Sequence, residues 1–294
     1  MNTKELLEKE YLDYLVYSEL AKYEKDERLK GIFLSLSNSE RKHCEMLNKG
    51  FKSKSLILLS YLLLLYFLVV RKLLGIPFLT KMLERKEKES KAFYELLKGR
   101  SSMKVNKVVK EEMSHEKILS DETRRYESSL NYTRSVVFGL NDGLVEILAV
   151  VSGIATISGR PILVAISGII VGISGTLSMA AGAYLSSKST TLVTKTREFT
   201  KPIKDALYTG IFYFIGALIA TFPFFFGIGG YEGIILSIIS VSVALSIASY
   251  IIATISDSSI SVRIAEMLLI SLLTAFVTIG IGLVIKYYFG IYIT

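Results

Sequence analysis

The sequence carries Glu-Arg-Lys-His at residues 40–43 and Glu-Met-Ser-His at residues 112–115, and these two segments decide the fold. They contain the only two histidines of the chain, His43 and His115. On a helix, residues i and i+3 lie on the same face. Two helices with Glu-x-x-His, each opposite a helix with one further glutamate, supply the ligands of a carboxylate-bridged di-iron site in a four-helix bundle. The sequence therefore predicts such a bundle.

The other two helices of this bundle are predicted to carry Glu10 and Glu87. Tyr17 follows Glu10 by seven residues, and Tyr94 follows Glu87 by the same interval. Seven residues make two helical turns, so each tyrosine shares a face with its glutamate. The matching spacing predicts a duplicated helical hairpin. Each tyrosine is more simply explained as a core aromatic residue than as a partner of a metal site.

The predicted site contains four carboxylates and two imidazoles. Oxygen-rich ligand sets of this kind suit iron or manganese and disfavour soft metals. We expect Glu40 and Glu112 to bridge two metal ions, and Glu84, one turn before Glu87, is an alternative or auxiliary ligand. The full set is Glu10, Glu40, His43, Glu87, Glu112 and His115.

Charge divides the chain into two parts. Only eight of its 35 Lys and Arg residues, and seven of its 27 Asp and Glu residues, follow residue 134. The hydrophobic fraction of 51% and the mean hydropathy of +0.44 are high for a soluble protein. The net charge of +8 favours the cytoplasmic side of a membrane and anionic lipid. No recognition motif accompanies this charge, so nucleic acid is not expected as a partner.

The expected fold class is all-α, with a ferritin-like four-helix bundle over residues 1–125 and a five-helix transmembrane domain over residues 126–294. Helical spacing of the apolar residues predicts two helices within 3–50 and two more at 78–98 and 103–123.

The connection between the second and third of these helices is apolar from residue 56 to residue 70, except for Ser60. This segment is short for a membrane span, which needs about 20 residues. A single crossing would also place His43 and His115 on opposite sides of the membrane, where they could not share a site. We therefore predict a helix at the membrane surface or packed on a partner, with a re-entrant hairpin or an unusual crossing as alternatives.

Five further apolar segments are long enough to span a membrane. The connection at 187–206 carries five basic residues, whereas the neighbouring turns carry at most one. Basic loops lie on the cytoplasmic side. We expect an integral protein of the cell membrane, with its N-terminal domain cytoplasmic and its C-terminus outside. The predicted spans are 136–158, 161–186, 207–228, 233–255 and 264–285.

The first of these spans contains two carboxylates. Asp142 and Glu146 stand at i and i+4, so they share one face of the predicted helix. Carboxylates inside a membrane are costly and mark ion pathways by default; the alternative is a solvated position at the cytoplasmic rim. Met179 in the second span is either a soft neighbour for Fe²⁺ or a packing residue.

The motifs of the first two spans resemble a known family. Phe-Gly-Leu-Asn-Asp-Gly-Leu at 138–144 and Ser-Met-Ala-Ala-Gly-Ala-Tyr-Leu at 178–185 are similar to vacuolar iron transporters, and this resemblance covers roughly 130–294. Residues 1–125 resemble rubrerythrin-like ferritin domains. The combination is similar to membrane-bound ferritins, in which a di-iron bundle is fused to this transporter domain.

The resemblance implies a homodimer that moves Fe²⁺ along Asp142 and Met179 in exchange for protons. Vacuolar members carry a glutamate-rich extension between the second and third spans, where this chain has only Glu198 and an aspartate. Val171 occupies the place of a glutamate in their second span, for which Glu146 could substitute. Metal capture would then fall to the N-terminal bundle.

The leading hypothesis is an Fe²⁺ transporter that moves metal out of the cytoplasm, with a bundle that captures iron and oxidises it with O₂ or peroxide. One alternative is a membrane-anchored di-iron oxidase or peroxidase whose spans serve only as an anchor. Another is a manganese transporter with a metal-sensing bundle, because oxygen-rich ligands do not separate Mn²⁺ from Fe²⁺. The sequence assigns no certain catalytic residue.

Overall fold

The computed structural model describes residues 3–47, 53–97, 103–194 and 201–289. Within these ranges the chain is all-helical, as the sequence predicted. It divides into two compact units, Met1–Glu127 and Ser128–Thr294.

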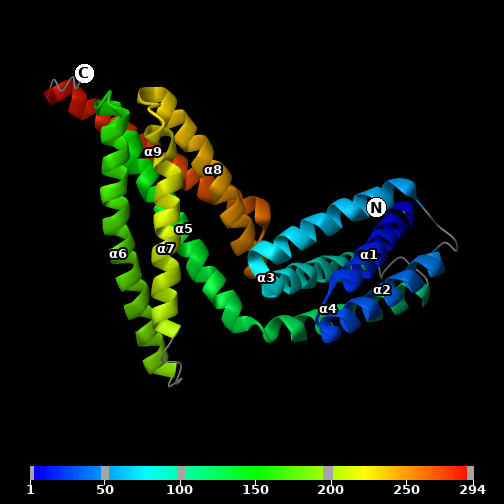
Figure 1. Cartoon of the computed structure of the whole chain (residues 1–294). Helices are drawn as coiled ribbons and strands as arrows, with labels where there is room; N and C mark the ends of the chain where they lie inside the picture. The colour runs from blue at the N-terminus through cyan, green and yellow to red at the C-terminus, as the bar shows by residue number, and fades with distance from the viewer. Residues whose placement is uncertain (1–2, 48–52, 98–102, 195–200, 290–294) are drawn as a thin grey trace. The chain divides into compact units, whose positions relative to one another are not determined.

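The first unit contains four helices within the described residues. Figure 1 shows them as α1 (Thr3–Tyr23), α2 (Glu27–Leu47), α3 (Lys54–Leu97) and α4 (Met103–Arg124). Helix α1 contacts α2 and α3, and α4 contacts α3 and α2, so the four helices close around a common interior. At the start of α2, Asp26 Oδ1 accepts hydrogen bonds from the backbone N–H groups of Arg28 (2.9 Å) and Leu29 (3.2 Å). This N-cap ends the α1–α2 connection.

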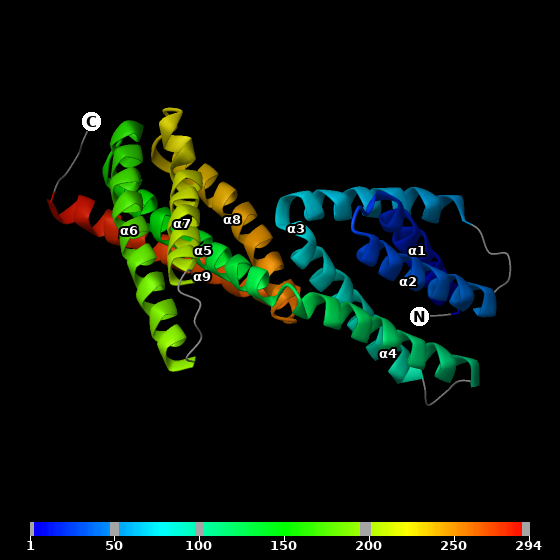
Figure 2. The ribbon, with the colours of Figure 1, turned by 60° about the horizontal axis from the view of Figure 1, so that its bottom comes forward.

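Helix α3 bends sharply at Gly75, as Figure 2 shows. Gly75 has φ 82° and ψ 176°, a backbone conformation that is essentially restricted to glycine, and Pro77 follows within the helix. The bend divides α3 into an N-terminal arm (54–74) and a C-terminal arm (76–97). The sequence predicted two separate helices here. The structure agrees, because the two arms are separate helical segments that meet at one non-helical glycine.

Helix α1 lies in the angle between the two arms of α3. Asp13 of α1 pairs with Lys86 of the C-terminal arm. Just beyond the end of α1, Glu24 pairs with Arg71 of the N-terminal arm at 2.8 Å. Both arms are therefore held on the same helix.

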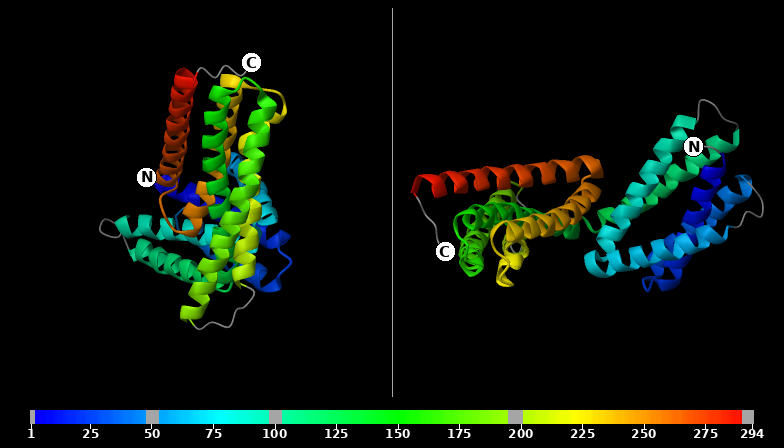
Figure 3. Two further views of the ribbon diagram at one scale, coloured as in Figure 1. Left: turned by 90° about the vertical axis from the view of Figure 1, so that its left-hand side faces the viewer. Right: turned by 90° about the horizontal axis from the view of Figure 1, so that it is seen from above.

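The second unit contains five helices within the described residues, and Figure 3 shows them coloured from green to red. They are α5 (Glu127–Ile157), α6 (Pro161–Thr194), α7 (Lys201–Phe225), α8 (Gly230–Ile255) and α9 (Ile260–Phe289).

Six of the described helices are long and apolar enough to cross a membrane: the five of the second unit, and α3 over Lys54–Ala92. The sequence predicted five spans and placed residues 56–70 outside the membrane core. The long connection predicted at 187–206 is mostly helical, since α6 continues to Thr194 and α7 begins at Lys201. Two of its basic residues, Lys195 and Arg197, lie outside the described residues.

Glycines bring α5 and α7 into backbone contact. A Cβ atom on Gly139 would overlap the carbonyl oxygen of Thr209, and a Cβ atom on Gly143 would overlap that of Tyr213. Gly216 of α7 also packs on the backbone of α5, where a Cβ atom would lie 2.8 Å from the carbonyl oxygen of Leu140. Small residues serve helix packing in lipid, where no water-driven force holds helices together. These contacts fix the rotation of α5 about its axis.

The bend in α3 can be tested by substitution. We expect Gly75→Ala to destabilise the first unit by about 1–3 kcal/mol, because alanine does not tolerate this backbone conformation. Thermal unfolding of the purified protein in detergent should show a lower Tm for the first unit.

Gly31→Ala is the matched control for this substitution. Gly31 lies within α2, and open space surrounds the position of its Cβ. Alanine should stabilise this helix by up to about 1 kcal/mol. Equal Tm values for the two variants would contradict a strained bend at Gly75.

Candidate metal centre

The six predicted ligands come together inside the first unit. They form two quartets, and within each quartet one ligand atom per residue lies within 4.8 Å of the others. All six side chains are buried. Glu40 and Glu112 belong to both quartets, which is the arrangement expected of carboxylates that bridge two ions. The quartets are Glu10, Glu40, His43 and Glu112, and Glu40, Glu87, Glu112 and His115.

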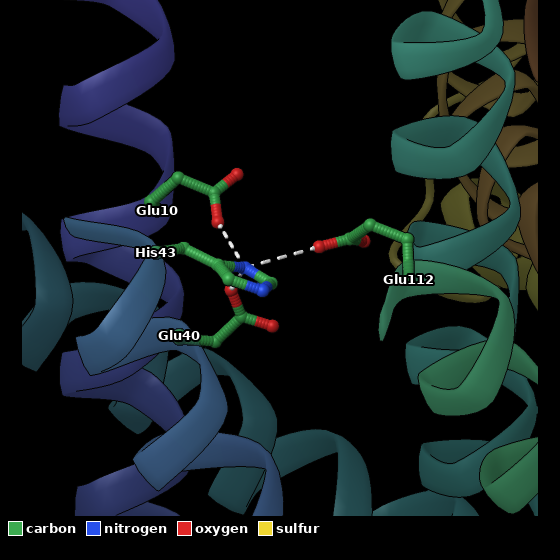
Figure 4. Close-up of side chains that lie close together, drawn as sticks. All are labelled: Glu10, Glu40, His43 and Glu112. Atoms are coloured by element: carbon green, nitrogen blue, oxygen red, sulfur yellow. Dashed lines mark hydrogen bonds and ion pairs between the residues drawn. The ribbon is translucent and has the colours of Figure 1, made fainter. Parts of the chain in front are cut away.

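In the first quartet, three carboxylates converge on one ring nitrogen. Nδ1 of His43 lies 3.0 Å from Glu10 Oε2, 3.2 Å from Glu40 Oε2 and 3.5 Å from Glu112 Oε1. Figure 4 shows that Glu112 approaches from the side opposite Glu10, Glu40 and His43. The α1–α2 hairpin and α4 therefore face each other across this quartet.

The second quartet is built around Nδ1 of His115. This atom lies 3.0 Å from Glu40 Oε1 and 4.0 Å from Glu112 Oε1. It is nevertheless buried without a hydrogen-bond partner among the described residues. The two oxygens of Glu40 thus face different histidines, whose rings stack with centroids 5.8 Å apart. A bound cation explains an orphaned buried nitrogen among carboxylate oxygens, so the donor set fits a pair of iron or manganese ions.

Burial governs the charges of the cluster. Burial raises the pKa of Glu40 well above its usual range, and burial together with the neighbouring carboxylates raises that of Glu112 to about 11. Burial also opposes ionisation of Glu10 and His43, but the hydrogen bonds and charges of the neighbouring side chains together outweigh it. The pKa of Glu10 falls to about 2, and that of His43 rises to about 11. For Glu40 and Glu112 burial is the largest cause, and like charges that cannot all ionise add to it; bound cations would relieve the repulsion.

Two partners of the cluster were not predicted in these roles. Glu111 Oε2 lies 2.7 Å from Nε2 of His43, on the far edge of the ring. A carboxylate in this position orients a metal-binding histidine. Tyr17 is fully buried and donates a hydrogen bond to Glu87, the glutamate of the other hairpin. Sequence spacing cannot pair residues on different helices, so neither contact had a signal; the matching Tyr94 lies outside the described side chains.

Glu84, the predicted auxiliary ligand, lies outside both quartets. Its Oε1 atom pairs with Lys81 at 3.3 Å and with Lys88 at 2.8 Å. These lysines supply the positive charge that a buried carboxylate requires. The structure therefore gives Glu84 ion pairs in place of a position among the clustered ligands.

The predicted transport-path residues line two cavities of the second unit. Asp142 and Glu146 line a cavity of about 430 Å³ together with Thr274 and Thr278 of α9. Met179 lines another of about 790 Å³, at the end of the unit where α5, α7 and α9 begin. Met179 and the two carboxylates thus line different cavities.

Two polar side chains beside these cavities were missed by the sequence analysis. Tyr213 of α7 is fully buried and donates a 2.7 Å hydrogen bond to Glu146 Oε2. Asn141 lines the larger cavity with Met179, and its Oδ1 atom is buried without a hydrogen bond among the described residues. The available signals were weak: Asn141 precedes Asp142, and Tyr213 is a polar residue within a span.

Comparison with known proteins identifies the second unit. The VIT (vacuolar iron transporter) family model matches residues 133–196 and 190–283, together more than half of the 294 residues. The chain belongs to the VIT family. Membrane metal ion transport is therefore the function indicated for the VIT region, which contains both cavities. No protein in the curated collection matches the chain.

Removing one shared carboxylate should separate stability from metal binding. Glu112→Gln removes one of four crowded buried carboxyl groups, so we expect the Tm without metal to stay equal or rise. The rise in Tm that Fe²⁺ or Mn²⁺ produces by binding the folded state should disappear. Anaerobic thermal unfolding with and without each metal measures both effects.

Glu84→Gln is the control for this prediction, since Glu84 is equally buried but paired with lysines. It should lower the Tm without metal and preserve the metal-induced rise. A metal response that survives Glu112→Gln and vanishes in Glu84→Gln would reverse the assignment of the two residues.

The Tyr213 hydroxyl is expected to support transport. A hydrogen bond to a charged group contributes about 1.5–3 kcal/mol, so Tyr213→Phe should slow metal flux about tenfold or more. Fe²⁺ uptake into proteoliposomes measures this loss. Tyr208→Phe, on the same helix but partly exposed, should retain full flux. Undiminished flux in Tyr213→Phe would show that transport does not require the hydrogen bond from Tyr213 to Glu146.

Proposed function

We propose that this protein exports Fe²⁺ from the cytoplasm and that its N-terminal bundle captures the metal. The observation that carries the proposal is the convergence of six buried ligands into two quartets in a chain of the VIT family. The family supports the transport of metal ions. The ligand chemistry supports iron or manganese as the metal.

In the membrane, Asp142 and Glu146 would replace the water around a divalent cation. Carboxylates within a span are costly and mark ion paths. Glu146 is exposed on the surface of the protomer, which supports a homodimer in which a second copy covers the acidic face. Protons are the proposed counter-ions, because a carboxylate that releases a cation can take up a proton. Met179 would contribute a soft thioether near the wider end of the path.

The orientation proposed places the bundle in the cytoplasm. Lys188 near the end of α6, and Lys201 and Lys204 at the start of α7, give the connection between these helices its basic character. Basic connections stay on the cytoplasmic side. Five spans then leave the C-terminus outside the cell membrane.

The bundle would act as a ferritin-like domain. The two quartets would each hold one ion, with Glu40 and Glu112 shared between them. Iron bound there supplies redox chemistry, so that captured Fe²⁺ can be oxidised by O₂ or peroxide. The protein's own part is to hold both ions away from water and to orient His43 through Glu111.

A second candidate is an oxidase or peroxidase anchored by its spans. The hydrogen bond from Tyr17 to Glu87 favours it, since a phenol beside a redox metal can supply a proton and an electron. Asp142 and Glu146 argue for transport, because an anchor needs no carboxylates. A manganese transporter with a sensing bundle uses the same ligands.

Flux through proteoliposomes tests these alternatives. Wild-type protein should carry Fe²⁺, and Asp142→Ala should abolish flux while the bundle keeps its metal-induced rise in Tm. Glu40→Gln should lose that rise and transport poorly at low Fe²⁺ concentration. Absence of wild-type flux, with Fe²⁺-dependent O₂ consumption retained, would support the anchored oxidase. Preferential flux and retention of Mn²⁺ would support the manganese transporter.

A further inference from the structure

We propose that the N-terminal arm of α3 (54–74) lies flat on the surface of an anionic bilayer and docks the bundle there. The proposal does not depend on which metal the protein moves. It rests on the two faces of the arm, on its attachment to α1, and on the charges at its ends.

The arm is apolar on both sides, yet the protein covers only one of them. The inner face is buried at Ser60, Leu64, Phe67 and Val70. The outer face follows the same helical spacing and is between 46% and 75% exposed at Leu58, Leu62, Leu65, Val69 and Leu73. A continuous exposed stripe of this kind marks a surface for a partner or a membrane.

The inner face is fixed on the bundle at both ends. At the start of the arm, Leu56 and Ile57 pack against Leu7 and Tyr11 of α1. At its far end, Arg71 pairs with the fully buried carboxylate that follows α1, Glu24. Because α1 carries Glu10, the arm and the metal ligands belong to one packed unit. The outer face therefore stays outward while the metal cluster is intact.

Crossing the membrane would dismantle this arrangement. The arm would have to leave α1, and Glu24 would remain buried without its arginine partner, which is strongly destabilising. A crossing would also separate α2, with His43, from the C-terminal arm of α3, with Glu87, across the bilayer. The length and composition of α3 fit a span, but its packing keeps the arm beside the bundle.

The lysines and tyrosines of the arm favour lipid over a second copy as the occupant of its outer face. Exposed Lys54 and Lys72 stand at the two ends of the arm, and Tyr61 and Tyr66 lie between them, half-exposed. Apolar stripes with flanking lysines and tyrosines are typical of helices that lie at a lipid interface. The same lysines would repel each other across a pair of copies.

The short connection between the bundle and the first span of the VIT region also favours lipid as the occupant. Helix α4 ends at Arg124, and the first span of the VIT region begins at Tyr132. Residues 127–131 of this connection already belong to α5, so it is shorter than the roughly 25 Å of a fully extended chain. The bundle is therefore confined close to the bilayer surface.

Depth measurements on the full-length protein test the proposal. Cys44 is the single cysteine and is buried, so Cys44→Ser gives a clean background for one spin label at a time. Labels at Leu58→Cys, Leu65→Cys and Leu73→Cys would be examined by EPR in liposomes of phosphatidylglycerol and phosphatidylcholine, with O₂ and a water-soluble nickel chelate as relaxants. Lys42→Cys, exposed on α2, is the water-facing control.

All three labels should lie at one shallow depth, about 5–10 Å below the headgroups. Depths that run from one interface through the centre to the other would overturn the proposal in favour of a span. Water accessibility equal to that of Lys42→Cys would overturn it as well, and dipolar coupling between labels would then identify a second copy as the occupant.

A charge on the outer face gives a second, independent test. Leu62→Glu with Leu65→Glu should return the Leu58→Cys and Leu73→Cys labels to water, while the metal-induced rise in Tm shows that the bundle remains folded. Leu64→Glu, on the buried inner face, should instead abolish that rise. Labels that remain at the same depth in the double variant would overturn the proposal.

Discussion

Four carboxylates buried in one small cluster are the constraint on which the first unit depends. Such groups repel one another unless protons or cations neutralise them. The bundle surrounds them with partners: His43 pairs with Glu10, and Lys86 pairs with Asp13 one turn further along α1. Apolar packing of the four helices must then overcome the remaining repulsion. A cluster of this composition sacrifices stability, as groups placed for a function often do.

The same cluster determines the path of the chain. Its six side chains come from α1, α2, the C-terminal arm of α3 and α4, so α3 must return to the bundle after the apolar segment at 56–70. Gly75 makes that return possible at the point where the two arms meet, because its positive φ changes the direction of the chain without a longer loop. An apolar segment that would otherwise suit a membrane span is thereby bound along α1.

The sequence predicted which six side chains cluster because their signal is local. Glu-x-x-His places two side chains on one helical face whatever the tertiary structure. Contacts between helices carried no such signal, which is why Glu111 on His43 and Tyr17 on Glu87 were not foreseen. The ion pairs of Glu84 were missed for a related reason: spacing alone cannot separate a ligand from a carboxylate held by lysines on its own helix. The break between the two arms of α3 was predicted, but its position at Gly75 was not, because sequence does not give the sign of φ.

In the VIT region, Tyr213 of α7 contacts the helices around Asp142 and Glu146 and helps to fix the positions of these two carboxylates. The carbonyl of Tyr213 abuts Gly143 of α5, its ring lies against Gly175 of α6, and its hydroxyl donates to Glu146. Without a water-driven force between helices in lipid, such close contacts and internal hydrogen bonds set the geometry. Neighbouring residues on α5 point about 100° apart, so fixing its rotation sends Asp142 and the residue before it to different cavities. The close packing of the α5 glycines on α7 therefore explains why Asp142 and Asn141 line different cavities.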